Sequence, residues 1–215
     1  MNAVATPISQ IELTPGSAIR IGGVTWDGYV ALLQELGDDR LIRVAYENGV
    51  LEIRMPSQLH ESANRVLAAI ALTLAEEFGF EFNDLGSMTM NRSDLSKGVE
   101  PDSCFYIQNA AAGQGLGETS NDLPPDLALE VDIANRSNSK LSIYQAIGVP
   151  EIWLVQHSHV KIKHLENGVY VDASASRAFT AVSVEQLNQW LDLRRTGTDL
   201  TVVRAVRKFC QSTSR

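Results

Sequence analysis

One short segment, residues 127–133 (LALEVDI), constrains the fold of this chain more than any other part of the sequence. It has the length and apolar content of a buried β-strand, yet it carries Glu130 and Asp132 two residues apart. Side chains alternate between the two faces of a strand, so both carboxylates lie on one face. Like charges so close together repel each other and favour a cation between or beside them. We therefore expect a fold in which a cationic group lies next to this strand.

The first half of the chain predicts a helix, a hairpin and a longer helix. Thr25 precedes apolar residues with helical spacing and is a suitable N-cap. The segment RVAYENGVLEIRM has two β-rich runs around the Asn-Gly pair at 48–49, which is typical of a two-residue hairpin turn. After Ser57, apolar residues recur at helical spacing over 58–78, and Gly79 is suited to end that helix.

The second half adds further strands and helices. Residues 80–90 and 99–107 have the composition of strands, and 108–125 that of a surface loop. The remaining expected elements are the strand at 127–133, a helix at 138–147, a strand at 151–156, a hairpin over 159–173 and a helix after Ser183. This order predicts the α+β (mixed α/β) class, with one central mixed sheet flanked by helices and with peripheral hairpins.

The composition is that of a globular protein. Of 215 residues, 44% are hydrophobic and 20% charged, which suits one folded domain and excludes global disorder. No apolar run approaches the roughly 18 residues that a membrane span needs, and the N-terminus lacks the pattern of a secretory signal. Two cysteines, Cys104 and Cys210, are too few for a disulfide framework and fit no zinc spacing. We therefore expect a cytoplasmic protein.

Charge is distributed unevenly along the chain. Lys and Arg total 18 against 26 Asp and Glu, and the net charge of −8 disfavours coating of nucleic acid by bulk attraction. Residues 194–215 are the exception, with six basic residues against Asp199 alone. Such a segment is either a phosphate-binding arm or a solvated terminal helix. We set apart residues 193–215 as a basic C-terminal tail and residues 1–23 as an N-terminal arm.

A further acid and a lysine extend the charged site expected at strand 127–133. Asp102 follows Pro101 at the start of a β-rich run, and Lys140 lies eight residues after Asp132, at the start of the next helix. Carboxylates on adjacent strand ends supply the hard oxygen ligands that Mg²⁺ prefers. A nearby lysine supports the negative charge that develops during phosphodiester hydrolysis. The alternative interpretations are an exposed edge face and a pair of salt bridges.

The order of these residues resembles a known nuclease pattern. Pro101-Asp102 followed by Glu130 on a later strand is similar to the PD-(D/E)XK nuclease superfamily. More closely, the chain resembles the Uma2-like family of restriction-endonuclease-like proteins over about residues 24–192. Four stretches carry this resemblance: Thr25-Trp26 with Tyr29, Ser57 with His60-Glu61, Glu100-Pro101-Asp102, and residues 124–155.

The resemblance implies a restriction-endonuclease-like core over residues 24–192, dependence on Mg²⁺ (with Mn²⁺ as a substitute) and cleavage of DNA. It implies catalytic roles for Asp102, Glu130 and Lys140, with Asp102, Glu130 and Asp132 as metal ligands. The superfamily motif has its lysine two residues after the glutamate, where this chain has Asp132. In the related family a lysine in the following helix takes that role, which here is Lys140.

His60 and Glu61 are accessory candidates, because they match the His-Glu pair of the family and the first core helix of this fold often offers an acid to the metal. A histidine at a helix start is also common as a capping or surface residue. Glu61 near a helix N-terminus is favourable for the helix dipole alone.

Two functional hypotheses follow. The first is a Mg²⁺-dependent endonuclease that acts on DNA, expected as a homodimer because nucleases that cut both strands often pair subunits and twofold dimers are the commonest assemblies. The alternative is a catalytically impaired nuclease-fold protein that acts in nucleic-acid binding or self-association. Other enzyme classes lack support, since the sequence has no P-loop, G-x-S-x-G or G-x-G-x-x-G motif.

Overall fold

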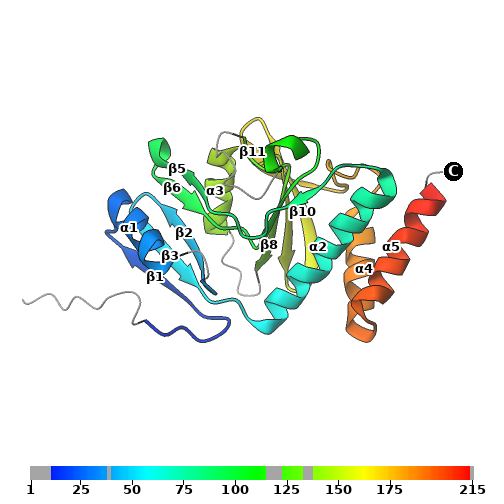
Figure 1. Cartoon of the computed structure of the whole chain (residues 1–215), viewed down its shortest axis with the longest axis horizontal. Helices are drawn as coiled ribbons and strands as arrows, with labels where there is room; N and C mark the ends of the chain where they lie inside the picture. Colours follow the sequence, from blue (N-terminus) through cyan, green and yellow to red (C-terminus); the bar gives the residue numbers. More distant parts are fainter. Residues whose placement is uncertain (1–10, 38–39, 115–122, 133–137, 214–215) are drawn as a thin grey trace, which may run out of the picture.

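The computed structural model describes residues 11–37, 40–114, 123–132 and 138–213. Within these ranges the chain has the predicted α+β class, and its strands form two sheets (Figure 1). None of the helices in these ranges is both long and apolar enough to cross a membrane.

The first sheet has the strand order β1-β3-β2-β6-β5, and all of its neighbours are antiparallel. Its turn between β2 and β3 is the predicted pair Asn48-Gly49, whose φ angles of 47° and 88° suit a tight hairpin. Helix α1 (Trp26–Leu36), capped by Thr25 as predicted, packs Tyr29 against this sheet. The strands are β1 (Ala18–Gly22), β2 (Arg43–Glu47), β3 (Val50–Arg54), β5 (Met90–Arg92) and β6 (Lys97–Val99).

The second sheet has the order β11-β10-β9-β8-β7-β4. Its β8 and β9 are parallel and its other neighbours antiparallel. A parallel pair needs a crossover connection, and α3 (Asn138–Ile147) supplies it. The strands are β4 (Asn83–Asp84), β7 (Ser103–Tyr106), β8 (Leu127–Asp132), β9 (Glu151–Gln156), β10 (His159–Glu166) and β11 (Val169–Ala173).

Helices cover both faces of the second sheet, which decides where the charged residues of β8 point. Helix α2 (Gln58–Phe78), α4 (Val184–Thr196) and α5 (Asp199–Thr213) share one apolar core with Leu129 and Val131. Ala128 faces the other core, together with Tyr144 of α3. Because side chains alternate along a strand, Glu130 lies on the side of α3.

The second sheet is the expected central mixed sheet flanked by helices, and the first sheet is an additional one that was not expected. The predicted strands 80–90 and 99–107 need correction, because the described residues there form the shorter β4, β5, β6 and β7. Pro101 separates β6 from β7; it has no N–H to donate, so the chain leaves the first sheet there and enters the second. This transition places Asp102 directly before β7, at the junction of the two sheets.

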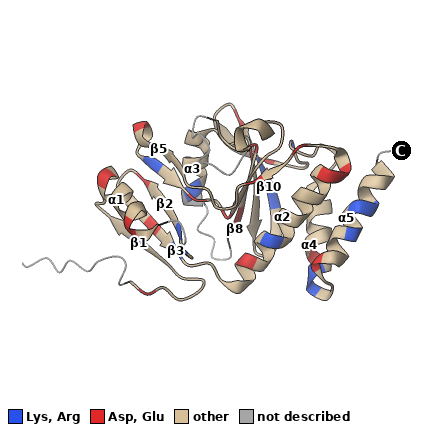
Figure 2. Ribbon diagram, viewed as in Figure 1, with Lys and Arg blue, Asp and Glu red and all other residues tan. Residues whose placement is uncertain are grey.

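The segments set apart as arm and tail contribute to the fold. Strand β1 pairs with β3. Helix α5 packs beside α2, with Val202, Val206 and Cys210 buried in the same core. Basic positions follow one another along α5 (Figure 2), and Arg207 pairs with Glu76 of α2 at 2.9 Å. The basic residues of this segment therefore belong to an amphipathic helix that completes the core.

Candidate active site

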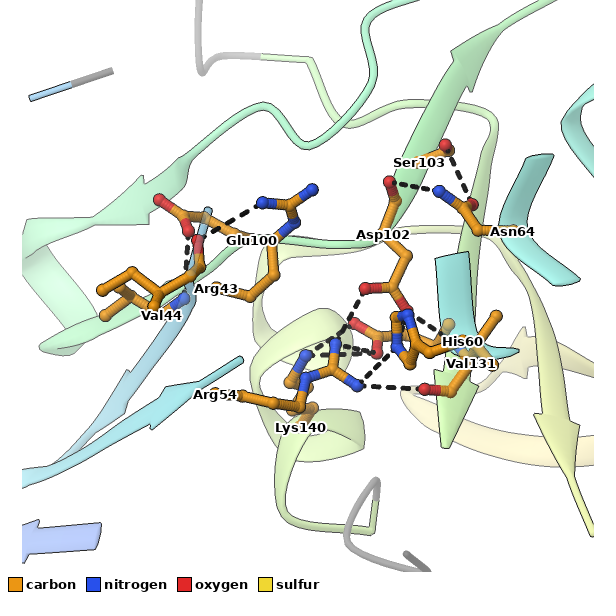
Figure 3. A network of polar contacts seen from close by, with 12 residues as sticks. Arg43, Val44, Arg54, His60, Asn64, Glu100, Asp102, Ser103, Val131 and Lys140 are labelled. Atoms are coloured by element: carbon orange, nitrogen blue, oxygen red, sulfur yellow. Dashed lines mark hydrogen bonds and ion pairs between the residues drawn. The ribbon is translucent and has the colours of Figure 1, made fainter. Parts of the chain in front are cut away.

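Charged side chains from five parts of the chain meet where the two sheets join (Figure 3). Arg54 ends β3, Asp102 precedes β7 and Glu130 lies in β8, while His60 and Lys140 lie near the N-termini of α2 and α3. All of them except Arg54 are at most 5% exposed. Charges in such a place interact strongly, because little water screens them.

Asp102 is held from several sides. Its Oδ1 accepts a hydrogen bond from Arg54 Nη2 at 2.8 Å. Its Oδ2 accepts one from the backbone N–H of Val131 at 2.7 Å and lies 3.0 Å from His60 Nε2. Its backbone oxygen accepts a hydrogen bond from the Asn64 side chain of α2 at 3.1 Å. The position of this carboxylate is therefore fixed by α2, β3 and β8 together.

Glu130 is held mainly by α3. Lys140 Nζ lies 3.0 Å from Oε1 and 3.1 Å from Oε2, so the ammonium bridges both oxygens. The hydroxyl of Tyr144, one turn further along α3, donates to Oε1. Arg54 Nη2 lies 3.6 Å from Oε2 and is thus shared between Glu130 and Asp102. The cationic group expected beside the strand is this pair of basic side chains.

The protonation states follow from burial and these partners. Burial alone raises the pKa of Asp102, but the charge of Arg54 and the hydrogen bond to His60 outweigh it and bring the pKa to about 2. Burial lowers the pKa of Arg54, but Asp102 and Glu130 raise it by more. Burial and the charge of Glu130 raise the pKa of Tyr144 well above its ordinary value. Asp102 is therefore ionised at neutral pH, whereas Arg54 and Tyr144 keep their protons.

The accessory candidates lie in different places. His60 joins the central group through Asp102. Glu61, the next residue, has a side chain that is 38% exposed and pairs with Arg65 at 2.9 Å, one turn along α2. Neighbouring residues of a helix point about 100° apart, so the Glu61 side chain points away from the group that His60 joins.

Asp132 ends β8 and is buried. It lines a pocket of about 450 Å³ between the ends of β8 and β9 and the helices α2 and α4. Among the described residues, no group of three or more His, Cys, Asp or Glu side chains is placed to hold a metal ion. The structure thus brings Asp102 and Glu130 together through Arg54. Asp132 does not form a three-residue metal-binding group with them.

Comparison with known proteins assigns the chain to a family. The family model Uma2, described as "Putative restriction endonuclease", matches residues 26–196. This chain belongs to the Uma2 family. The α+β fold is similar to the crystal structure of "a putative nuclease belonging to DUF820" from Anabaena variabilis. That likeness has a TM-score of 0.54 and 14% identity, over 78% of this chain and 99% of the other, and it establishes the fold alone. No curated protein matches the sequence.

Two residues of the site in this Uma2 protein were missed by the sequence analysis. Tyr144 lies four residues after Lys140, so helical spacing alone could have placed it beside Lys140 on α3. Arg54 carries no such signal, because nothing in the hairpin sequence shows that its end lies against β8. Only the general expectation of a cation beside the acids of residues 127–133 pointed to it.

The donor atoms of this Uma2 site suit a divalent metal ion. Asp102 Oδ1, Glu130 Oε2 and the backbone oxygen of Val131 all face the Arg54 guanidinium, at 2.8, 3.6 and 2.9 Å. Carboxylate and carbonyl oxygens are the ligands that Mg²⁺ and Mn²⁺ prefer. Asp102 and Glu130 are the side chains that would hold such an ion.

Proposed function

We propose that this protein is a Mg²⁺-dependent endonuclease that hydrolyses phosphodiester bonds of DNA, with Mn²⁺ as a substitute. The observation that carries the proposal is that Asp102, directly before β7, and Glu130 of the adjacent β8 both contact Arg54, and that the ammonium of Lys140 bridges the two oxygens of Glu130. Two carboxylates and a lysine in a buried polar site are the equipment that phosphodiester hydrolysis needs. The family description supports the same class of reaction.

Each residue has a separate role in this proposal. Asp102 and Glu130 would hold the cation, which would act as a Lewis acid that polarises a phosphoryl oxygen and lowers the pKa of water. Lys140 stabilises the negative charge that develops on the phosphate, because its ammonium is already aimed at this site. Tyr144 and His60 position the two carboxylates. Asp132 is an accessory residue at the end of β8, and the exposed Glu61 takes no part.

The test is conversion of supercoiled plasmid to nicked and linear forms with Mg²⁺ or Mn²⁺. Glu130→Gln should abolish cleavage. The matched control is Glu100→Gln, since Glu100 is equally buried but pairs with Arg40 and Thr89 in a separate network. Loss of cleavage in both variants while both stay folded, or cleavage by Glu130→Gln, would contradict the assignment.

A second candidate function is that of a nuclease-fold protein that binds nucleic acid or itself without cutting. Two observations favour it. Arg54 and Lys140 already pair with the two carboxylates, and Asp132 stands where the superfamily motif has its lysine. This function predicts DNA binding without cleavage in the wild type and in Asp132→Lys, with a metal bound.

In this proposal the endonuclease acts in the cytoplasm and as a homodimer. A homodimer is expected because a twofold pair presents two sites to the two strands of a duplex. Sedimentation equilibrium with and without duplex DNA tests the dimer. A monomer under both conditions, with cleavage intact, would remove the dimer from the proposal.

A further inference from the structure

The Arg54 guanidinium contacts three oxygen atoms of the second sheet. Nη1 donates to the backbone oxygen of Val131 at 2.9 Å and lies 2.9 Å from His60 Nε2 (Figure 3). Nη2 lies 2.8 Å from Asp102 Oδ1 and 3.6 Å from Glu130 Oε2. Arg54 itself ends β3 in the first sheet. One sheet therefore places a positive charge between two carboxylates of the other sheet.

We propose that Arg54 is an internal counter-ion that occupies the position of the divalent metal, and that the metal binds only when it displaces the guanidinium. The three oxygens are of the kind that a divalent cation takes as ligands. The guanidinium supplies the positive charge without which two buried carboxylates repel each other. This inference rests on the proposed function, because it takes Asp102 and Glu130 as the residues that hold the ion.

Arg54 is also the member of the site that is best able to leave it. Its side chain is 15% exposed, against 1% for Asp102 and 2% for Glu130. Within the part of the chain that the structure describes, its buried Nε has no hydrogen-bond partner. Lys140, by contrast, is 6% exposed and bridges both oxygens of Glu130. A metal ion at the three oxygens would repel the guanidinium, and Arg54 is the most exposed of these side chains.

The site keeps other partners when Arg54 is replaced. In Arg54→Met the apolar stem stays and the charge is lost. Asp102 retains the Val131 N–H and His60, and Glu130 retains Lys140 and Tyr144. We therefore expect Arg54→Met to fold with a lower melting temperature in the absence of metal, because a buried carboxylate has lost its main counter-ion.

The experiment is isothermal titration calorimetry of Mg²⁺ and Ca²⁺, in parallel with metal-dependent melting temperatures, on the wild type and on two variants. We expect Arg54→Met to bind both ions about tenfold or more tightly than the wild type, because one neighbouring charge shifts a buried ionic equilibrium by at least that factor. The matched control is Arg40→Met, which also breaks a buried arginine–glutamate pair, with Glu100. Arg40→Met should bind metal as the wild type does.

Arg54→Lys provides a second variant that keeps the positive charge during folding. A compact ammonium on a shorter side chain cannot contact all three oxygens at once, so we expect a metal affinity between those of the wild type and Arg54→Met. Equal or weaker binding in Arg54→Met than in the wild type would overturn this inference and leave the metal site of the proposed function in place. No binding and no thermal shift in any folded variant would overturn both.

Discussion

Lys140 Nζ lies 3.0 and 3.1 Å from the two carboxylate oxygens of Glu130, although ten positions of the chain separate the residues. The contact arises because α3 is the crossover between the parallel strands β8 and β9, so its first turn lies near the end of β8. A lysine on this turn reaches the carboxylate from the helix. The presence of Asp132 at the lysine position of the superfamily motif therefore does not remove the positive charge from the site.

Tyr144→Phe tests whether Tyr144 positions Glu130 for cleavage or only stabilises the folded protein. The change removes only the hydroxyl that donates to Glu130. We expect the free energy of unfolding to fall by about 1 kcal/mol. Plasmid cleavage should fall by about tenfold or more, as is typical when a metal-ligating side chain loses its hydrogen-bond partner. Urea unfolding and the nicking assay measure the two effects.

The control is Tyr170→Phe, which removes a hydroxyl that donates to the Val149 backbone oxygen at 2.6 Å, away from the site. It should lose similar stability and keep full cleavage. Equal cleavage by both variants would show that Tyr144 has only a structural role.

Asp102 makes the stability of the protein depend on acid pH. Its pKa is lowered from 3.8 to about 2 in the folded protein, so its ionised form stabilises the fold above the ordinary pKa. As the pH falls below 4, that contribution declines, and it is lost below pH 2; the total is about 2 kcal/mol. Urea midpoints measured between pH 6 and pH 2.5 should therefore fall more steeply for the wild type than for Asp102→Asn. Parallel profiles would contradict the ionic contact with Arg54.

Val206→Asp tests whether the basic C-terminal segment belongs to the folded domain. Val206 is fully buried between α5 and α2, so an unpaired carboxylate there should lower the free energy of unfolding by about 3 kcal/mol or more. Arg204→Asp, on the exposed side of the same helix, should cost less than about 1 kcal/mol. Equal, small effects in urea unfolding would mean that this segment is an independent tail.

The sequence predicted the local elements well where a few neighbouring residues determine them. Thr25, Ser57 and Gly79 mark helix ends in the structure as they do in the sequence, and the Asn48-Gly49 turn forms the expected hairpin. The assignment to the Uma2 family and the α+β class are confirmed as well.

Contacts between distant segments were not predictable in the same way. The stretch 80–107 is divided between two sheets. Pro101 interrupts the predicted strand 99–107, so β6 lies in the first sheet and β7 in the second. Arg54 enters the site only through the packing of the first sheet against β8, which no local pattern encodes. The sequence therefore indicates both acids and the lysine, but not the arginine that contacts the two acids.

The most direct test of the proposed mechanism is plasmid cleavage by Lys140→Met, with Mg²⁺ affinity measured on the same preparation. Because the ammonium acts on charge that develops in the transition state, turnover should fall by about 10²–10³-fold. Mg²⁺ should bind at least as tightly as to the wild type, because Glu130 has lost a neighbouring positive charge. Lys140→Arg should restore only part of the rate, since a planar guanidinium does not replace a compact charge. Full cleavage by Lys140→Met, with its fold and metal binding intact, would contradict the account.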